Sequence, residues 1–399
     1  MNSIQKELVK STVPILKTNG NALISYFYQR MLTNSPELKN IFNMANQASG
    51  KQHNALTGAV LAYAENIDDP SVLINTLKSI GNKHVSLNIT PEQYDIVGTH
   101  LINSIIEVLG ADANSDLIEA WTCAYNELAS IMIGIEAAMY EKNSQKKGGW
   151  KGWRSFKIAK IVSESAEINS FYLKPADEKE IADFFPGQYI SVSTYIPELG
   201  HKQPRQYSLS SNSNNEFYRI SVKKETGQAN PDGIVSNALH NKKVGDELEV
   251  SAPAGLFYAD PESKNPLVLL SGGVGLTPMM SMVETNKNAL QQNPTIWIHS
   301  CRNENVHAFK DTIEELNNEK TWLKSYVFYE TLPDTQTNAF EGRIDLQQIK
   351  EDILIKDAKY YICGPAIFIK VQYQSLVGLG VDRENILYEE FGPQLLSLN

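Results

Sequence analysis

The chain has 399 residues, a length that predicts two or three domains rather than one. Its formal net charge of −10 and its pI near 5.3 argue against a nucleic-acid-binding surface, which needs concentrated Lys and Arg. Cys123, Cys301 and Cys363 lie far apart, so the sequence contains neither a CxxC zinc pair nor a CxxCH haem-attachment motif, and so few cysteines suit a reducing compartment.

The N-terminal residues, Met-Asn-Ser-Ile-Gln-Lys-Glu, lack the basic and then apolar pattern of a signal peptide. No uninterrupted apolar run is long enough to span a membrane. We therefore expect a soluble cytoplasmic protein.

Apolar residues recur at helical spacing up to about residue 140. Pro36, Pro70 and Pro91 interrupt the pattern, and the last two stand where helices commonly begin. An all-α domain is predicted. Its apolar stripes are Ile24, Phe27, Tyr28 and Met31; Leu56, Ala59, Val60, Tyr63 and Ile67; and Leu117, Trp121, Ala124, Leu128, Met132, Ile135 and Met139.

A polar stretch that ends in paired glycines, residues 141–149, is the best linker in the chain. Beyond it the apolar period falls to two, as in 189–193 and 217–222, and turn residues recur at short intervals up to about residue 257. This pattern predicts a small antiparallel β-barrel.

From Pro266 onward, apolar runs alternate with helix-like segments, which is typical of a parallel sheet with crossover helices. The runs are 267–270, 295–298, 326–329 and 360–363. We therefore predict a multidomain chain with an all-α domain at 1–147, an antiparallel β-barrel domain at 148–258 and an α/β parallel-sheet domain at 259–399.

Histidines in the helical part have two interpretations. On spacing alone, His53, His84 and His100 are ordinary hydrogen-bonded core histidines. However, four segments, namely Phe27–Met31, Ser35–Met44, Lys83-His84 and Pro91–Gly98, closely resemble, in the same order, the globin domain of bacterial flavohaemoglobins.

The resemblance implies a haem b site in which His84 is the proximal iron ligand. It places Tyr94 and Glu136 behind that ligand, where a carboxylate gives the imidazole more imidazolate character, which suits an oxygenase more than an oxygen carrier. Without the resemblance, Tyr94 would be an ordinary helix-surface tyrosine and Glu136 a solvated glutamate.

The same resemblance places Tyr28 and Gln52 on the distal side, facing the bound ligand, where the phenol can donate to bound O₂. It also places Phe42 against the haem and Leu56 one turn beyond Gln52, where it narrows the site to diatomic ligands. For Phe42 and Leu56, plain core packing predicts the same position.

Two motifs in the barrel region resemble those of ferredoxin-reductase-type flavoproteins. They are Pro186-Gly187-Gln188-Tyr189 and Arg205-Gln206-Tyr207-Ser208. The resemblance implies FAD, with the arginine on the pyrophosphate, the tyrosine against the isoalloxazine and the serine near N5. The segment Gly233-Ile234-Val235-Ser236-Asn237 resembles the one that approaches the FAD phosphates at a helix N-terminus. For Arg205-Gln206-Tyr207-Ser208 taken alone, the alternative is an ordinary strand that starts with a basic residue and contains an aromatic one.

A glycine-rich turn between a predicted strand and a predicted helix resembles the NAD(P) loop of these reductases, Gly-x-Gly-x-Thr-Pro, and differs from the GxGxxG fingerprint. Its residues are Gly273, Val274, Gly275, Leu276, Thr277 and Pro278. Cys363-Gly364-Pro365 resembles the family's nicotinamide-side motif. We expect Cys363 to position the nicotinamide without chemistry of its own, and the alternative is a small buried hydrophobe.

The C-terminal motif comprises Tyr388, Glu389, Glu390, Phe391, Gly392 and Pro393, and it resembles the family's Tyr-Glu-x-Phe-Gly-Pro ending. The resemblance places Phe391 against the flavin and Glu389 between flavin and haem, paired with Lys83. Two solvated surface charges are the alternative for that pair. Glu390 departs from the smaller or uncharged residue usual in the family. Arg302 alone does not decide between NADH and NADPH, and NADH is favoured.

The resemblance as a whole implies an NAD(P)H-dependent nitric oxide dioxygenase that turns nitric oxide into nitrate with haem-bound O₂, for detoxification. We expect nitric oxide and O₂ as substrates, and neither an obligatory protein partner nor a bound nucleic acid, hence a monomer. Two alternatives stay open: an O₂ or NO sensor or store kept ferrous by its own reductase, and a reductase that serves an outside acceptor through a globin without haem.

Overall fold

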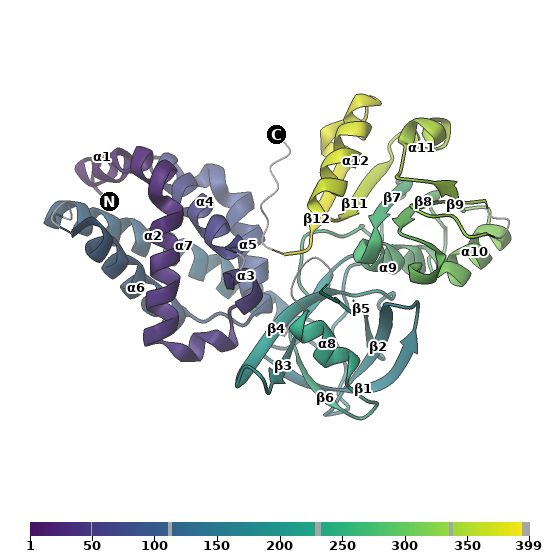
Figure 1. Cartoon of the computed structure of the whole chain (residues 1–399), viewed down its shortest axis with the longest axis horizontal. Coiled ribbons are helices and arrows are strands. Elements are labelled where there is room, and N and C mark those ends of the chain that lie inside the picture. The colour runs from purple at the N-terminus through teal and green to yellow at the C-terminus, as the bar shows by residue number, and fades with distance from the viewer. Residues whose placement is uncertain (49, 111–113, 228–232, 335–337, 393–399) are drawn as a thin grey trace. The chain divides into compact units, whose positions relative to one another are not determined.

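The computed structural model describes residues 1–399 except 49, 111–113, 228–232, 335–337 and 393–399. The chain forms two compact units (Figure 1). The first, called the helical unit below, contains residues 1–153 together with 193–205. The second, called the reductase unit, contains residues 154–192 and 206–399.

The N-terminal part is helical, as predicted. Its α-helices are α1 (Ser3–Ser11), α2 (Val13–Asn34), α3 (Met44–Ala48), α4 (Lys51–Glu65), α5 (Ile74–Ser86), α6 (Pro91–Leu109) and α7 (Ser115–Gln145). Pro36, Pro70 and Pro91 each begin a helix, the first two of 3-10 type, because proline fixes φ and loses no hydrogen bond there. Ile67 lies beyond the end of α4, although its side chain is buried.

Side chains at the helix starts satisfy backbone N–H groups that would otherwise lack acceptors. Thr90 and Gln93 form a capping box at α6, and the Asn114 side chain accepts from the Leu117 N–H at 2.8 Å. Residues from all three predicted apolar stripes meet in one core, which includes Ile24, Tyr63 and Trp121. Packing of these faces, rather than helix propensity, supplies most of the stability of such helices.

The predicted antiparallel strands are present. They are β1 (Arg154–Ser163), β2 (Ile168–Pro175), β3 (Tyr189–Ile196), β4 (His201–Ser208), β5 (Tyr218–Lys223) and β6 (Glu247–Val250), in the sheet order β4-β3-β6-β1-β2-β5. A further bridge between Leu209 and Ile220 joins the chain just after β4 to β5, so the two ends of the sheet meet. One helix, α8 (Ile234–His240), lies between β5 and β6 in the sequence.

The C-terminal part alternates strands with helices, as predicted. Its strands are β7 (Leu267–Gly272), β8 (Thr295–Cys301), β9 (Leu323–Tyr329), β10 (Phe340–Glu341), β11 (Lys359–Gly364) and β12 (Ile386–Glu390), and its helices are α9 (Leu276–Lys287), α10 (Lys310–Glu319), α11 (Lys350–Ile353) and α12 (Ala366–Gly378). The strands pair in parallel in the order β10-β9-β8-β7-β11-β12.

The parallel sheet is buried on both faces, which explains its unbroken apolar runs. Alternate residues of β7 point to opposite sides, so Leu267 and Leu269 join the core that contains α9 and α10 residues. Val268 and Leu270 join the core that contains α12 residues. Figure 1 shows α12 beside β11 and β12. This doubly covered sheet leaves its carboxyl ends for ligand-binding loops.

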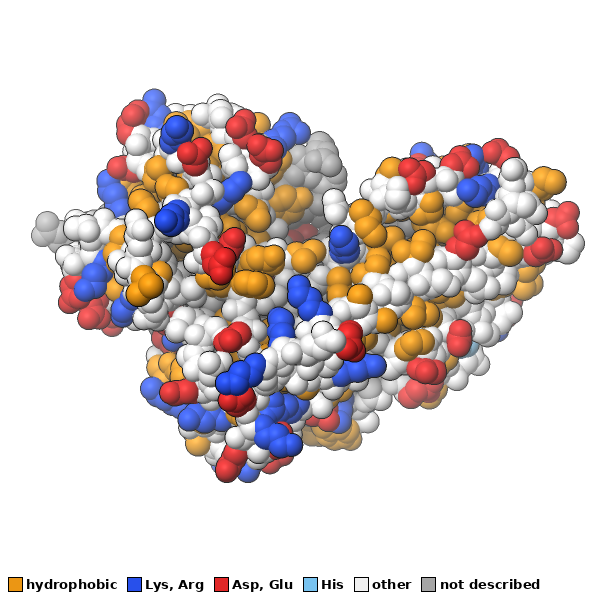
Figure 2. Space-filling model, turned by 180° about the vertical axis from the view of Figure 1, so that it is seen from behind, with side chains coloured by type: hydrophobic (Ala, Val, Ile, Leu, Met, Phe, Trp, Pro, Cys, Tyr) orange, Lys and Arg blue, Asp and Glu red, His pale blue; other side chains and the backbone are white. Residues whose placement is uncertain are grey.

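The polar stretch at 141–149 is a linker only in part, because α7 continues to Gln145 and β1 begins at Arg154. The predicted domain boundaries at 147 and 258 stay predictions. On the face shown in Figure 2, Lys and Arg side chains are interspersed with Asp and Glu. Among the helices of the described ranges, none has both the length and the apolar character needed to cross a membrane.

Candidate functional site

Three helices of the helical unit bring His84, Tyr94 and Glu136 together. His84 lies in the last turn of α5, Tyr94 in the first turns of α6 and Glu136 on α7. The His84 Nδ1 is 2.8 Å from Glu136 Oε1 and 3.0 Å from the Tyr94 hydroxyl, which itself donates to Glu136 Oε1 at 2.5 Å. The structure thus brings together the three residues predicted for the proximal side.

This proximal cluster is largely shielded from water. The Glu136 residue is 3 % exposed, whereas the His84 side chain keeps 33 % of its surface accessible. Burial, and then the negative charge of Glu136, raise the pKa of Tyr94 far above its usual value, so its hydroxyl stays protonated and donating. Glu136 is therefore not the solvated glutamate that the sequence alone would favour.

The geometry of the cluster fixes which ring nitrogen of His84 can bind a metal. Its Nδ1 side faces the carboxylate and the phenol, so Nε2 is the remaining nitrogen. Nearby hydroxyls hold the supporting backbone: Tyr125 donates to the Tyr94 carbonyl at 2.5 Å, and Tyr140 donates to the Ile89 carbonyl at 2.8 Å. An imidazole backed by a buried carboxylate is a donor set that fits haem iron.

A second cluster surrounds Tyr28 on α2. The Tyr28 ring stacks on His53, with centroids 5.2 Å apart, and meets Phe42 edge-on at 5.6 Å. Burial raises the pKa of Tyr28 well above its usual value, and a hydrogen bond with Gln52 partly offsets that rise. Phe42 and Leu56 pack against the helical core. Tyr28 and Gln52, predicted for the distal side, and Phe42, predicted to lie against the haem, thus belong to one neighbourhood.

Sequence reasoning missed two members of this distal cluster. His53 bonds to Ser25 Oγ through Nδ1 at 2.9 Å and to Gln47 Oε1 through Nε2 at 3.0 Å, and burial lowers its pKa. Gln47, on α3, lies close enough to Tyr28 to offset part of the rise in the Tyr28 pKa, and its buried Nε2 makes no hydrogen bond of good geometry among the described residues. Such an atom is a donor that a bound ligand can satisfy, which fits a polar ligand near Tyr28. Only the position of His53, one residue after Gln52, signalled this arrangement.

Gln203 is a third residue that the sequence did not reveal. It lies on β4, in the 193–205 segment that belongs to the helical unit, and is 1 % exposed. Its Nε2 donates to the carbonyls of Lys39 at 2.8 Å and Phe42 at 3.2 Å, and its Oε1 accepts from the Met44 N–H at 3.2 Å. A single amide therefore fixes the backbone on both sides of Phe42.

The residues predicted to contact FAD lie on β3, β4 and α8. Arg205, Gln206 and Tyr207 are half-buried at the end of β4, and Ser208 is buried. The Gln206 amide donates to Ser191 Oγ at 3.3 Å, which holds its side chain against β3. Tyr189 lies against the backbone of Gly255, where φ is +110° and a Cβ would come within 2.9 Å of the Tyr189 ring.

Gly233 directly precedes α8, as predicted, but its N–H already donates to the Glu225 carbonyl at 3.1 Å. A Cβ at Gly233 would lie 2.5 Å from Ser236 Oγ and 2.7 Å from the Glu225 Cβ. Ser236 Oγ bonds back to the Gly233 carbonyl, and Val235 is buried. The glycine is therefore needed for close packing of its own turn, a reason that the FAD-phosphate interpretation did not include.

The predicted NAD(P) loop follows β7 and opens α9 through a short 3-10 turn at Gly273–Gly275. Its two glycines have different roles. Gly273 has φ +54°, and a Cβ placed there would meet no other atom within 4 Å, whereas a Cβ at Gly275 would stand 2.2 Å from the Cys363 carbonyl oxygen. Gly275 is thus required by backbone contact with β11, and Gly273 is the glycine that leaves room for a phosphate.

The remaining residues of the loop are held by α9. Thr277 is buried, with Oγ1 donating to the Val274 carbonyl at 3.1 Å, and Leu276 and Pro278 are buried in the first turn of the helix. Residues Gly273, Val274, Gly275, Leu276, Thr277 and Pro278 therefore form one continuous turn at the carboxyl end of β7.

Cys363 and Gly364 end β11, and Pro365 precedes α12. Cys363 is fully buried, and burial raises the pKa of its thiol well above the usual value, so it is no nucleophile. In the parallel register Cys363 pairs with Glu389 and Gly364 with Glu390, which aligns the two C-terminal motifs. Phe391 is 44 % exposed, Gly392 has φ +129°, and Pro393 lies outside the described residues.

Comparisons with known families cover most of the chain. The Globin model matches residues 25–132, the oxidoreductase FAD-binding domain model matches 155–258, and the oxidoreductase NAD-binding domain model matches 269–374. Together with the fold, these matches define the class: a globin joined to an FAD- and NAD-binding oxidoreductase.

Proteins that match this chain over nearly its whole length identify the family within that class. A flavohemoprotein of Rhizobium meliloti is 48% identical over 399 aligned residues, which cover 98% of each chain. The crystal structure of a flavohemoglobin from Malassezia yamatoensis with bound FAD and heme has a TM-score of 0.85 and 27% identity, and covers 98% of this chain and 99% of that one. The chain belongs to the flavohemoprotein family.

A second solved structure matches only the reductase part. It is the FAD/NAD-binding domain of a nitric oxide dioxygenase from Vibrio cholerae, 36% identical, with a TM-score of 0.53, and it covers 60% of this chain and 99% of that chain. The cofactors of the protein are haem, FAD and NAD(P)H. The residues described above fit these cofactors. The Nε2 atom of His84 is available for iron, and Tyr207 and Arg205 are half-buried where FAD is predicted. The turn at Gly273 leaves open space for the dinucleotide.

Proposed function

We propose that the protein is a nitric oxide dioxygenase, which uses NAD(P)H and O₂ to convert nitric oxide into nitrate. Its domains make it an NAD(P)H-dependent oxidoreductase, and the Vibrio cholerae reductase domain that it resembles belongs to a protein of that activity. The observation that carries the proposal is the bond between His84 and the buried carboxylate of Glu136 at 2.8 Å. An oxygen store has less need of an imidazole made more basic in this way.

The chain's own residues have separate roles in this proposal. Glu136 accepts a hydrogen bond from the Nδ1–H of His84 and so raises the electron donation of the opposite nitrogen. Tyr94, held protonated by burial, donates to the same carboxylate oxygen and fixes its direction. Tyr28, also protonated at every physiological pH, keeps a donor available on the distal side.

Three cofactors are needed because the donor supplies electrons in pairs, whereas haem iron takes them singly. When bound, FAD accepts a hydride from NAD(P)H and passes single electrons to haem, where O₂ binds. Conversion of one nitric oxide to nitrate with one O₂ requires one electron overall. One NAD(P)H therefore serves two nitric oxide molecules.

Three further assignments belong to the proposal. Lys83 and Glu389 are predicted to pair between haem and flavin, and Phe391 is predicted to cover the flavin. We also propose that the protein works as a monomer in the cytoplasm, without an obligatory partner. Its three cysteines, which are all free thiols, suit a reducing compartment.

A nitric oxide electrode tests the proposal. Purified holoprotein with NADH in air should consume nitric oxide, release nitrate and oxidise NADH only while nitric oxide is present. Under argon the steady consumption should be lost. A sensor or store would bind nitric oxide once, in an amount equal to its haem, without continued NADH oxidation.

A further inference from the structure

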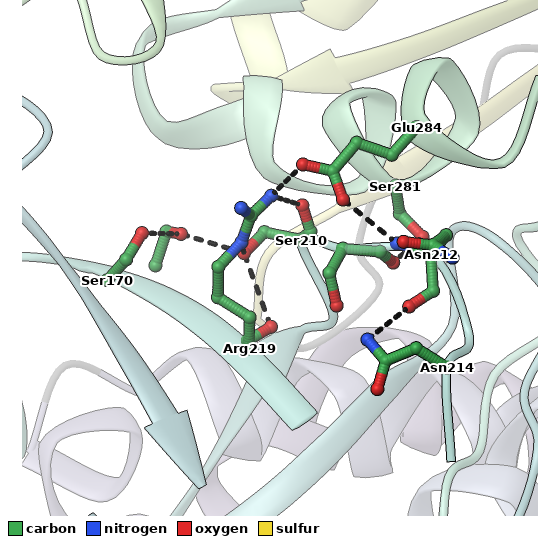
Figure 3. Close-up of polar contacts among 9 residues, drawn as sticks. Ser170, Ser210, Asn212, Asn214, Arg219, Ser281 and Glu284 are labelled. Carbon is green, nitrogen blue, oxygen red and sulfur yellow. Dashed lines mark hydrogen bonds and ion pairs between the residues drawn. The ribbon is translucent and has the colours of Figure 1, made fainter. Parts of the chain in front are cut away.

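A buried arginine connects the antiparallel barrel to the parallel-sheet lobe of the reductase unit. This lobe comprises the strands β7 to β12 and the helices between them. Arg219 lies on β5 and is 7 % exposed. Its Nη2 is 2.8 Å from Oε1 of Glu284 on α9, and its Nε donates to Ser210 Oγ at 3.1 Å (Figure 3). Nη2 also donates to the Ser210 carbonyl. One guanidinium therefore holds a barrel loop and a helix of the other lobe.

Helix α9 completes this connection with a second and a third bond. The other carboxylate oxygen of Glu284 accepts from the Asn212 N–H at 3.1 Å, and Ser281 Oγ donates to the Ser211 carbonyl at 2.7 Å. Ser281 and Glu284 are three residues apart and so share one face of the helix. This face binds Ser211 and Asn212, and Arg219 binds the preceding residue, Ser210, so three consecutive residues of the barrel loop are held; Figure 3 shows the bonds of Arg219 to Ser210 and of Glu284 to Asn212.

Neighbouring side chains hold the Arg219 guanidinium in the position where it meets Glu284. A row of buried hydroxyls runs from Ser170 to Ser221 to Ser210, with both Oγ–Oγ distances at 2.7 Å, and ends at the arginine. The guanidinium also lies 5.1 Å from the ring centre of Phe309, which belongs to the parallel-sheet lobe. A buried charge is costly unless it is paired and hydrogen-bonded, so Arg219 favours the arrangement in which Glu284 reaches it.

The two segments joined by this connection adjoin the residues predicted to bind the flavin and the dinucleotide. The loop 210–212 begins one residue beyond Arg205–Ser208, the predicted flavin-binding segment. Helix α9 begins directly after the Gly273–Gly275 turn, the predicted NAD(P) loop. A shift at Glu284 is therefore transmitted along one rigid helix to the dinucleotide, and a shift at Ser210 along a few residues to the flavin.

We propose that Arg219 and Glu284 are positioning residues for hydride transfer: their ion pair fixes the NAD(P) lobe against the barrel so that the nicotinamide C4 hydride faces N5 of the flavin. The proposal rests on the reductase half of the proposed function. In this step the C4–H bond breaks, an N5–H bond forms, and the electron pair moves from the nicotinamide to the flavin. Misplacement of reacting atoms by about 1 Å can slow such a step by about a hundredfold.

The central test variant is Glu284→Gln, which keeps the shape of the side chain and removes its charge. The limiting rate of FAD reduction by NADH, followed in a stopped-flow instrument under argon, should fall about tenfold or more. The affinity for adenosine diphosphate ribose, which binds the NAD(P) lobe alone, should stay unchanged. Arg219→Lys should restore part of the rate that Arg219→Met loses, because lysine keeps the charge.

Hydrogen exchange tests the contact itself in the protein as purified, independently of activity. The Asn212 N–H donates to Glu284, so peptides that contain residues 209–214 should exchange faster in Glu284→Gln, with little change in β7 or β8. The matched control is Asp352→Asn, which weakens an ion pair with Lys324 at 2.7 Å inside the parallel-sheet lobe. This control should match the wild-type protein in both measurements.

Three results would overturn the proposal: an unchanged limiting rate in Glu284→Gln, an equal loss in Asp352→Asn, or a loss of affinity for adenosine diphosphate ribose that accounts for the slower reduction. If Glu284→Gln does not fold with FAD, Ser281→Ala, which loses one hydrogen bond, decides by the same criteria, with a drop of about fivefold expected. FAD reduction needs no haem. A wild-type protein that reduces FAD but consumes no nitric oxide would therefore refute the proposed function and leave this inference intact.

Discussion

Histidines in two regions of the molecule are bonded to different kinds of polar group: half-buried His84 in the helical unit, and the buried pair His299 and His307 in the reductase unit. In the helical unit, His84 meets the carboxylate of Glu136 at 2.8 Å. In the reductase unit, His299 and His307 stack with ring centres 4.7 Å apart, and their Nδ1 atoms meet only hydroxyls, of Ser271 at 2.9 Å and Tyr329 at 2.8 Å.

The partner atom determines what each histidine can do. A carboxylate accepts a proton from the ring and makes its other nitrogen a stronger ligand, whereas a hydroxyl merely satisfies one neutral nitrogen. Burial lowers the pKa of His299 well below its usual value and that of His307 to about 4, so both are neutral at pH 7. The pair in the reductase unit is therefore structural, and His84 of the helical unit is the candidate metal ligand.

The largest expected effect comes from His84→Ala. Without the imidazole the haem iron loses its protein ligand, so the Soret band should be lost or greatly weakened and nitric oxide consumption abolished. His307→Ala is the comparison variant and should keep its haem. Absorption spectra of the two purified variants check this, and a normal Soret band with full activity in His84→Ala would remove the haem assignment.

The second prediction concerns acid stability. Because the pKa of His307 is about 4 in the folded chain and near 6.5 when exposed, the unfolded chain binds the proton more tightly between these values. The stability contributed by the neutral ring is present above pH 6.5 and is lost as the pH falls toward 4, about 3 kcal/mol in all. The groups that face His307 are His299, Tyr329, Lys310 and Glu304.

His307→Gln should remove most of this pH dependence. Hydrogen exchange of the β8 amides, corrected for the intrinsic effect of pH, measures the free energy of opening in both proteins. A wild-type protein that loses no more stability than His307→Gln between about pH 7 and pH 4.5 would contradict the structural role given to this ring.

Glu136→Gln sharpens the comparison, because it gives His84 a neutral partner. Loss of such a partner typically costs about tenfold to a hundredfold in activity, so nitric oxide consumption should fall by that order while haem stays bound. The iron–histidine stretch in resonance Raman spectra should move to lower frequency. Glu107→Gln is the control, since Glu107 pairs with Arg30 at 3.0 Å near the surface of the same unit. Equal activity in Glu136→Gln and the wild-type protein would show that the carboxylate does not strengthen His84 as an iron ligand.

Tyr94→Phe should have the smallest effect. It removes one hydrogen bond to Glu136, worth about 1 kcal/mol, so activity should fall about fivefold. The Raman shift should take the same direction as in Glu136→Gln and be smaller. A loss larger than that of Glu136→Gln would mean that the phenol, and not the carboxylate, governs the ligand.

Much of the fold was predictable, because each part has its own hydrophobic period. The helical stripes, the alternating strands and the apolar runs of the parallel sheet all appear where the sequence indicates them. The predicted end of the helical part was less accurate, since α7 continues to Gln145 through polar residues that have no reason to break a helix.

Site residues that belong to a recognisable motif were predictable from the sequence. Site residues whose role depends only on their packing in the fold were not. His84, Tyr94 and Glu136 were reached through resemblance, since residues ten and fifty-two positions apart show no relation by spacing. Gln203 and Gln47 were missed because an isolated glutamine in a sequence does not reveal whether its amide is buried. Gly275 was predicted only as part of the NAD(P) loop, and the motif did not reveal that close contact with the Cys363 carbonyl also requires a glycine there.

The visible spectrum of the purified protein tests the central claim, a haem iron held by His84 and reduced by NADH through FAD. After reconstitution with haem and FAD, NADH added under argon should bleach the flavin and move the Soret band to its ferrous position. A protein that shows no Soret band when supplied with haem, or one whose flavin bleaches while the Soret band stays fixed, would contradict the account.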